Sequence, residues 1–316
     1  MTNIVGHCRL CCLSKPLQDS HIIPKFVFDW MKETGLRFLR RPEQPNIRYQ
    51  DGQRERLLCR ACERLLSKDE KRFAEHVFRP FLKNSKLEMR YGEFLIRFSV
   101  SLCWRILVSE ALSDRMHNAF DDRLSEAEVE WRNFLLGRQP LKKFDRFHVF
   151  LADILDARDQ PTLNFNQYLT RFTDGCIAMS QSACAVYVKF SRFLFWAEIT
   201  EYDQSKWLGT RIQNEGGILS TPQHVSDSRF GAFLLGRAKL ASERYWLGLS
   251  ERQKRRIYEA FRQNAVNLIG TDFWRSFQAD MEANVDPHVW KTDKIEPNEL
   301  CPCGSGETYN ECHGKQ

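Results

Sequence analysis

The chain has 316 residues, of which 42% are hydrophobic and 28% charged, and its formal net charge is +6. These values are ordinary for a soluble globular protein, and the length predicts two domains with small metal modules. No stretch approaches ~18 consecutive apolar residues, and no basic region followed by an apolar run opens the chain. A membrane span, a secretory signal and a membrane partner are therefore excluded, and we expect a cytoplasmic protein.

The positive charge is concentrated at the N-terminal end. Residues 1–90 carry 19 Lys and Arg against 11 Asp and Glu, whereas the remainder carries 28 against 30. A basic surplus of this kind indicates contact with a phosphate backbone, and a solvated basic surface explains it equally well.

Two CxxC pairs mark the N-terminal segment, residues 1–66. Cys8 and Cys11 form the first pair, and Cys59 and Cys62 follow after 47 intervening residues. Each pair supplies two thiolates from one tight turn, so together they predict a four-thiolate structural zinc site. A redox pair is the competing interpretation. Cys12 offers a second register for the first pair and His7 could substitute as a ligand, but Cys8 with Cys11 has the better spacing.

A helix and an arginine-rich loop are predicted between the two pairs. Pro24 suits a first helical turn, apolar residues follow at helical spacing, and Gly35 can end the helix. An irregular loop is predicted over residues 36–56, in which Phe38 and Tyr49 could stack on bases. Its arginines are candidate nucleic-acid contacts, with a solvated loop as the alternative: Arg37, Arg40, Arg41 and Arg48.

The order of motifs in residues 5–70 resembles the zinc-stapled HNH endonuclease family. The resemblance rests on the two CxxC pairs and, between them, the segment Asp19-Ser20-His21-Ile22-Ile23-Pro24. The resemblance implies a treble-clef or ββα-metal module that binds nucleic acid, DNA rather than RNA, in bacterial DNA processing or defence. It also implies His21 as general base, Asn46 as the loop residue that orients it, and Mg²⁺ or Mn²⁺ for catalysis.

Two positions depart from the pattern of that family. Ser20 stands directly before His21, where a metal ligand is usual, and Glu63 stands after the second pair, where the family has His. Since carboxylates bind Mg²⁺ well, an altered metal shell would use Asp19 and Glu63. The alternatives are a purely structural His21 that bonds the loop backbone and a Glu63 that stabilises the first turn of a helix.

The central segment, residues 67–284, is predicted to be mainly helical with a short β hairpin or sheet. A capping-box pattern at Ser67 and Glu70 opens one helix, which Pro80 should stop. Residues 183–200 predict one or two strands with a turn or bulge near Ser191, and residues 210–219 a further short strand or hairpin turn. Helices are predicted, in chain order, over about 68–80, 92–113, from 125, over 147–155, from 250 and over 271–284.

A second zinc site is predicted at the C-terminal end, after a linker over residues 285–299. Three thiolates and one imidazole occur in residues 300–316 with turn glycines between them, and their spacing resembles the SEC-C motif over about residues 298–315. Glu307 and Glu311 stand where that motif is usually lysine-rich, which argues against an anionic docking partner. The predicted ligands are Cys301, Cys303, Cys312 and His313.

Together these features predict an α+β, mainly α, protein with two structural zinc ions. The preferred hypothesis is a nucleic-acid-binding protein that acts as an HNH-type endonuclease with His21 as general base. The alternative is a non-catalytic adaptor whose zinc modules bind a protein or a nucleic acid, with the central domain as scaffold. A third hypothesis places an activity in the central domain, where no motif is recognised.

Overall fold

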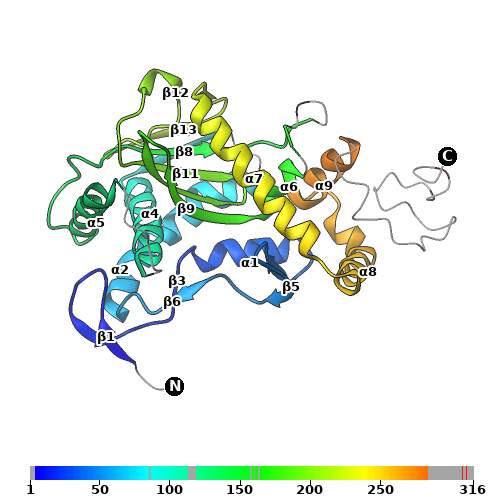
Figure 1. The fold of residues 1–316 in the computed structure, drawn as a ribbon, viewed down its shortest axis with the longest axis horizontal. Coiled ribbons are helices and arrows are strands. Elements are labelled where there is room, and N and C mark those ends of the chain that lie inside the picture. Colours follow the sequence, from blue (N-terminus) through cyan, green and yellow to red (C-terminus); the bar gives the residue numbers. More distant parts are fainter. Residues whose placement is uncertain are drawn as a thin grey trace. The chain divides into compact units, whose positions relative to one another are not determined.

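The computed structural model describes residues 4–84, 87–112, 119–156, 159, 161–162, 164–283, 308 and 311. The chain divides into two compact units, each drawing on three stretches of sequence. Unit one consists of Met1–Val27, Gly52–Ala152 and Thr173–Ser228. Unit two consists of Phe28–Asp51, Asp153–Phe172 and Arg229–Gln316. Both units mix helices and strands (Figure 1), and the predicted domain boundaries stay predictions.

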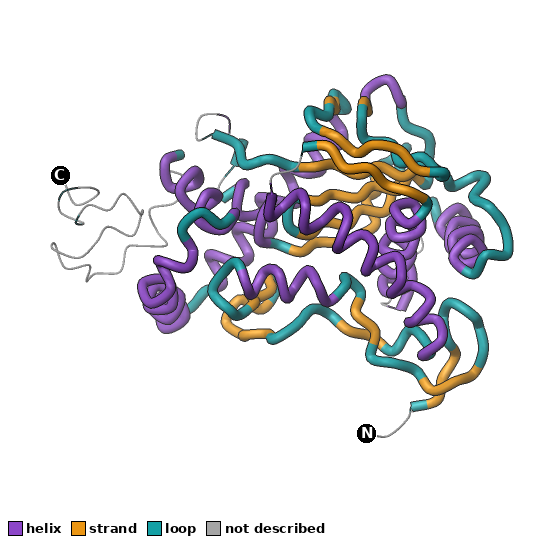
Figure 2. The backbone as a smooth tube through the Cα atoms, turned by 180° about the vertical axis from the view of Figure 1, so that it is seen from behind, coloured by secondary structure: helices purple, strands orange, loops and turns teal. Residues whose placement is uncertain are grey.

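Unit one is built around a four-stranded antiparallel sheet in the order β8-β11-β10-β9, whose strands run side by side in Figure 2. Every residue of β8, β10 and β11 is buried, while β9 is largely half-buried. Ser191, in the left-handed region with φ 46°, turns the chain between β10 and β11, so the strands and turn predicted there are confirmed. The bounds are β8 Phe147–Leu151, β9 Thr173–Met179, β10 Cys184–Phe190 and β11 Phe193–Glu198.

The helix predicted over residues 147–155 is wrong, because β8 (Phe147–Leu151) is a strand. A strand that is buried throughout shows a continuous apolar run without the alternation that would distinguish it from a helix. The one polar side chain in this strand, His148, is wholly buried. It bonds Thr210 Oγ1 at 2.9 Å through Nδ1 and Glu198 Oε1 at 3.1 Å through Nε2, which satisfies both ring nitrogens.

Helix α4 (Phe94–Leu112) covers the sheet, and the helix predicted over 92–113 is confirmed. It contacts β9, β10 and β11, while α2 and α5 pack against it in turn. The core between helices and sheet is aromatic, with the rings of Phe73 and Phe98 stacked at 4.1 Å. The bounds of these helices, and of the two segments that follow α2 in the chain, are α2 Arg60–Phe73, η1 Ala74–Phe78, α3 Arg79–Asn84 and α5 Asp121–Leu135.

The bounds predicted for the helix before α4 are wrong at both ends. Helix α2 begins at Arg60, and Ser67 lies inside it with its hydroxyl donating to the Arg64 carbonyl at 3.1 Å, so Ser67 does not cap. A π-helical turn, η1, follows, and Pro80 occupies the second position of α3 rather than ending a helix. Because η1 runs directly into α3, with Arg79 itself helical, Pro80 lies inside a continuous helical stretch just after the π-helical turn. Such turns occur where the ordinary hydrogen-bond ladder of a helix is interrupted. Helix α5 also begins earlier than predicted, at Asp121.

Short strands complete unit one. β7 pairs with β13 and β12 with β14, so a strand within residues 210–219 is confirmed in part. The remaining pairs, β1 with β2 and β3 with β6, belong to the N-terminal segment. Their bounds are β1 Val5–His7, β2 Ser14–Pro16, β3 Ser20–His21, β6 Arg54–Glu55, β7 Glu88–Gly92, β12 Trp207–Leu208, β13 Gly216–Ser220 and β14 His224–Val225.

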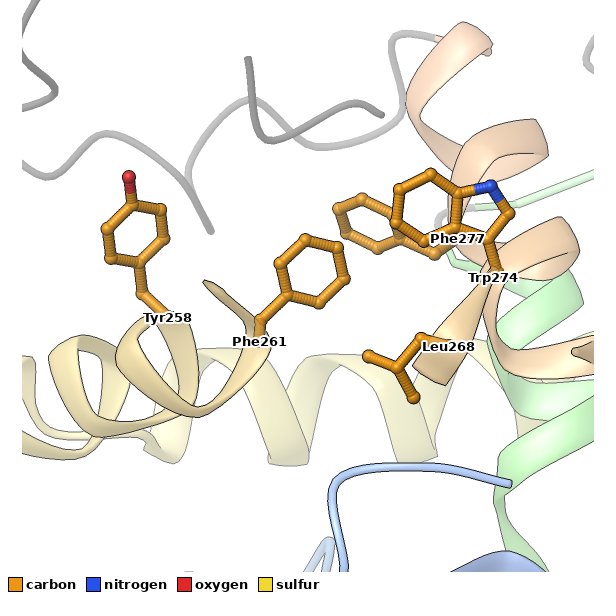
Figure 3. Close-up of a cluster of buried hydrophobic side chains, with 5 residues drawn as sticks. All are labelled: Tyr258, Phe261, Leu268, Trp274 and Phe277. Atoms are coloured by element: carbon orange, nitrogen blue, oxygen red, sulfur yellow. The ribbon is translucent and has the colours of Figure 1, made fainter. Parts of the chain in front are cut away.

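Unit two contains a β hairpin and a set of helices. The predicted helix after Pro24 is α1, which begins in unit one and continues into unit two, and the predicted helices from 250 and over 271–284 are α8 and α9. Phe261 of α8 stacks on Trp274 of α9 with ring centroids 5.7 Å apart, at the centre of the cluster in Figure 3. The bounds are α1 Lys25–Glu33, α6 Phe165–Arg171, α7 Ser228–Gly248, α8 Glu251–Leu268 and α9 Asp272–Glu282.

Residues 36–56 are not the irregular loop that the sequence predicts. They contain β4 (Leu39–Arg41) and β5 (Gln44–Tyr49), which pair antiparallel with one irregularity, and then β6 of unit one. Arginine-aromatic stacking stabilises the hairpin: the Arg48 guanidinium lies 4.2 Å from the Phe38 ring centroid and that of Arg41 lies 4.5 Å from the Tyr49 ring centroid. Such pairs replace the alternating apolar pattern by which strands are usually recognised.

None of the helices in the described residues combines the length and apolar character needed to cross a bilayer.

Candidate metal centre

The first CxxC pair lies in the turn between β1 and β2. The Cys8 N–H donates to the Leu13 carbonyl at 3.0 Å, and the Cys12 N–H donates to the Cys8 carbonyl at 2.8 Å. Cys12 adopts the left-handed region with φ 59°, which lets the chain reverse directly after Cys11. This local geometry points two thiols in one direction from a single turn.

The second pair lies at the start of α2. Cys59 is the N-cap residue and Cys62 lies in the first turn, and both side chains are buried. Backbone bonds join this segment to the first pair, since the Arg9 N–H donates to the Leu57 carbonyl at 2.8 Å and the Cys59 N–H donates to Cys8 Sγ at 3.3 Å. The two pairs are thus held together by the fold around them.

The four sulfurs of Cys8, Cys11, Cys59 and Cys62 lie within 4.8 Å of one another, and Cys11 Sγ and Cys59 Sγ are 4.0 Å apart. Tetrahedral zinc with bonds of about 2.3 Å places its sulfur ligands about 3.8 Å from each other. The cluster therefore has the size and donor set of a structural zinc site. Cys12 is exposed and its thiol contacts the Arg132 guanidinium, so the structure selects the register with Cys11.

The thiols of the cluster differ in acidity when no metal neutralises them. Burial raises the pKa of Cys59, but bonds from the Cys62 backbone and thiol and from Cys8 outweigh it and lower the pKa to about 7. Burial and the negative charge of Cys8 raise the pKa of Cys62, and burial raises that of Cys11. Zinc binding would therefore displace protons from these sulfurs, because each must be a thiolate to ligate the ion.

His21 follows the first CxxC pair in the sequence and lies in β3, which pairs with β6. The register sets His21 opposite Arg54 and Ser20 opposite Glu55. Arg54 Nε donates to His21 Nε2 at 3.2 Å, and Arg54 Nη1 forms an ion pair with Asp19 Oδ2 at 3.3 Å. The arginine thus connects two of the residues that the sequence singled out. Sequence reasoning missed Arg54, because only strand pairing brings it to His21 across 33 positions.

Glu63 lies in the first turn of α2, and its Oε1 is buried with no hydrogen-bond partner among the described residues. In the described part of the chain, the four cysteines are the one group of three or more Cys, His, Asp or Glu side chains close enough to share an ion. Asp19, His21 and Glu63 do not form such a group of three among the described residues. The metal shell of Asp19 and Glu63 therefore stays a prediction.

The remaining candidates belong to unit two. The Asn46 amide donates to the Gly248 carbonyl at 2.7 Å and accepts from the Ser250 N–H at 2.8 Å, which ties the β4–β5 hairpin to the connection between α7 and α8. Arg40 is half-buried and donates to the Pro45 carbonyl at 2.5 Å and to Gln253 Oε1 at 2.7 Å. Arg37 and Arg48 are exposed and Arg41 is half-buried. The predicted tail ligands Cys301, Cys303, Cys312 and His313 lie outside the described residues.

Comparison with known proteins identifies a relative for the tail. A stretch of 34 residues is 59% identical to the protein translocase subunit SecA of Nitrosomonas eutropha (strain DSM 101675 / C91 / Nm57), and this stretch covers 11% of the chain and 4% of that protein. The chain thus matches only a small part of the length of that relative. No solved structure matches the chain. No family match supports the HNH resemblance, whereas residues 298–315 match the SEC-C motif, as the sequence predicts.

Proposed function

We propose that the chain is a zinc-stapled nucleic-acid-binding protein with a treble-clef module at its N-terminus. The observation that carries this proposal is the convergence of four cysteine sulfurs from a β1–β2 turn and from the start of α2. A treble clef takes its ligands from these two kinds of position and holds a hairpin between them. The pair of β3 with β6, which includes His21 and Arg54, occupies that place in the chain.

The second candidate function is phosphodiester hydrolysis with His21 as general base. Nε2 of His21 accepts the Arg54 N–H, so in this arrangement Nε2 is an unprotonated acceptor. A phosphate that draws Arg54 away would leave Nε2 able to take a proton from an attacking water while the P–O bond to the leaving oxygen breaks. A bound Mg²⁺ or Mn²⁺ would stabilise the charge on that leaving oxygen. The exposed Asp19 and the partnerless Glu63 oxygen are its candidate ligands.

Two assays separate the nuclease from the non-catalytic adaptor. The first measures binding of labelled duplex DNA, single-stranded DNA and RNA to the full zinc-loaded chain. The second compares plasmid nicking by the wild type and His21→Ala in Mg²⁺ and in Mn²⁺, with zinc content measured for both. We expect both proteins to bind nucleic acid, and the variant to nick the plasmid at least about 100-fold more slowly than the wild type.

Nicking that survives His21→Ala would move the active site away from this hairpin. If the chain binds nucleic acid but nicks the plasmid under none of the conditions, the non-catalytic adaptor is the remaining hypothesis. If it binds no nucleic acid at all, the proposed function is refuted. Arg54→Gln supplies a further check, because it removes the guanidinium but leaves the histidine. In a nuclease it should weaken substrate binding more than it changes the pH dependence of cleavage.

A further inference from the structure

The β4–β5 hairpin and the first turns of α8 present a set of arginines on one rigid support in unit two. Residues 36–50 carry four arginines and one acidic residue, and residues 250–262 carry five Lys and Arg against two Glu. In Figure 1, β5 lies beside α8. Five side chains of this set are exposed and Arg41 is half-buried. The six are Arg37, Arg41, Arg48, Arg252, Arg255 and Arg256.

Specific contacts fix the hairpin to the helix. Arg40 spans the two elements through its bonds to the Pro45 carbonyl and to Gln253 Oε1. Asn46 binds the Gly248 carbonyl and the Ser250 N–H, directly before α8. A side chain at Gly248 would meet Pro45 Cγ at 2.8 Å, so the glycine permits the close approach. Arg40 and Asn46 therefore act as positioning residues for the surface around them.

Positive charges from the hairpin and from α8 both act on the guanidinium group of Arg40. Burial lowers the pKa of Arg40, and the positive charges of Arg48 on the hairpin and Arg256 on α8 lower it further, while Tyr245 opposes them. None of the six arginines forms an ion pair within the part of the chain that the structure describes, whereas the neighbouring Lys254 pairs with Glu251 at 2.8 Å. Guanidinium groups that have no ion-pair partner, carried on two elements that contact each other, favour a polyanion.

From this arrangement we infer that the hairpin and the start of α8 form a binding surface for the sugar-phosphate backbone of a nucleic acid. The geometry favours phosphates over bases. The rings of Phe38 and Tyr49 are already engaged by Arg48 and Arg41, so they stabilise guanidinium groups instead of offering free faces to bases. Contacts of this kind position a nucleic acid without reading its sequence. The inference rests on the proposed nucleic-acid function and gives it a location in unit two.

The test measures binding of a labelled mixed-sequence DNA duplex by fluorescence anisotropy over a range of salt concentrations, with the full chain. The α8 variant carries Arg252→Gln, Arg255→Gln and Arg256→Gln. Loss of three phosphate contacts should weaken binding at least about tenfold at ~100 mM salt and reduce the slope of log K against log salt by about 2.7. Lysine at the same three positions should retain the salt slope, since the charges remain.

A matched control removes three positive charges in unit one, by Arg138→Gln, Lys142→Gln and Lys143→Gln. We expect this control to bind within about twofold of the wild type. Equal binding by the α8 variant and the wild type, or an equal loss in the control, would overturn the inference and leave the proposed function intact. Failure of the wild type to bind any nucleic acid would instead refute the proposed function. Arginine-dependent binding of polyglutamate without DNA binding would assign the surface to an acidic protein.

Discussion

The buried carboxylate of Asp280 shows how much one residue can determine the behaviour of unit two. It accepts the N–H of Asn166 at 3.2 Å and of Gln167 at 3.0 Å, in the first turn of α6, so α9 supplies the acceptor for that helix end. The residue before α6, Asn164, provides no such bond from its own side chain. Burial raises the pKa of Asp280 to about 7, although the two N–H bonds lower it.

We predict that Asp280 makes the protein less stable as the pH rises from about 4 to 7. In this window the folded state keeps the proton that the unfolded state has released, so the folded state binds more protons and the free energy of unfolding falls with pH. Asp280→Asn cannot titrate. The stability of the wild type relative to Asp280→Asn should therefore fall by roughly 2 kcal/mol between pH 5 and pH 7 in urea unfolding. A difference that stays constant over this range would contradict the raised pKa.

At the scale of elements, a buried cluster of mostly aromatic side chains packs α8 against α9 in unit two. Phe261 is 4% exposed and contacts both Trp274 and Phe277, with ring centroids at 5.7 and 5.2 Å. On the same helix, Val266 is 84% exposed. The two positions therefore offer a buried and an exposed truncation within one helix.

We expect Phe261→Ala to lower the free energy of unfolding by about 3–5 kcal/mol, because it removes a buried ring and leaves a cavity between α8 and α9. Val266→Ala should change it by less than about 0.5 kcal/mol. Urea unfolding measures both values, and hydrogen exchange of the α8 and α9 amides locates the effect. Equal effects of the two substitutions would show that this helix pair does not pack as described.

The sequence predicts elements well where one physical signal dominates. The apolar α4 and the periodic α8 are examples, as is the reversal at Ser191. It fails where partners distant in the chain decide the outcome. Arginine-aromatic pairs make β4 and β5 strands without apolar alternation, and burial on both faces hides the identity of β8. No prediction covers α7, in which Gly231 and Gly236 lower the helix propensity although Asp227 and Ser228 are residue types common at helix starts.

The candidate site follows the same division. Spacing alone predicts that the four cysteines form one site. Each CxxC pair is a local pattern, and the only further inference needed is that the two pairs share an ion. The bond from Arg54 to His21 depends on strand register, and no local pattern indicates it. The bonds of Asn46 depend on a connection about 200 positions further along the chain, which explains why a motif-based role for it cannot be read from its neighbours.

At the scale of the whole molecule, the four-cysteine cluster joins two stretches of unit one that the chain separates by a stretch of unit two. Cys8 and Cys11 precede residues 28–51 of unit two, and Cys59 and Cys62 follow them. A fragment covering residues 1–66 would therefore cut through both units. Zinc bound at this position would close a long loop, and its binding free energy would add to the stability of the folded chain.

The full chain should contain two zinc ions, one in this cluster and one in the SEC-C motif. Metal analysis should return about one zinc per chain for Cys11→Ser and for Cys303→Ser, because each removes one of four ligands. Cys12→Ser is the matched control for Cys11→Ser: it changes the adjacent, exposed thiol outside the cluster and should retain both ions. Zinc loss from Cys12→Ser, or two ions in Cys11→Ser, would mean that the first pair uses the other register. Chelation of the wild type should lower its melting temperature, and reloading with zinc should release protons, since the pKa values of Cys62 and Cys11 are raised in the metal-free cluster and a ligating sulfur must lose its proton.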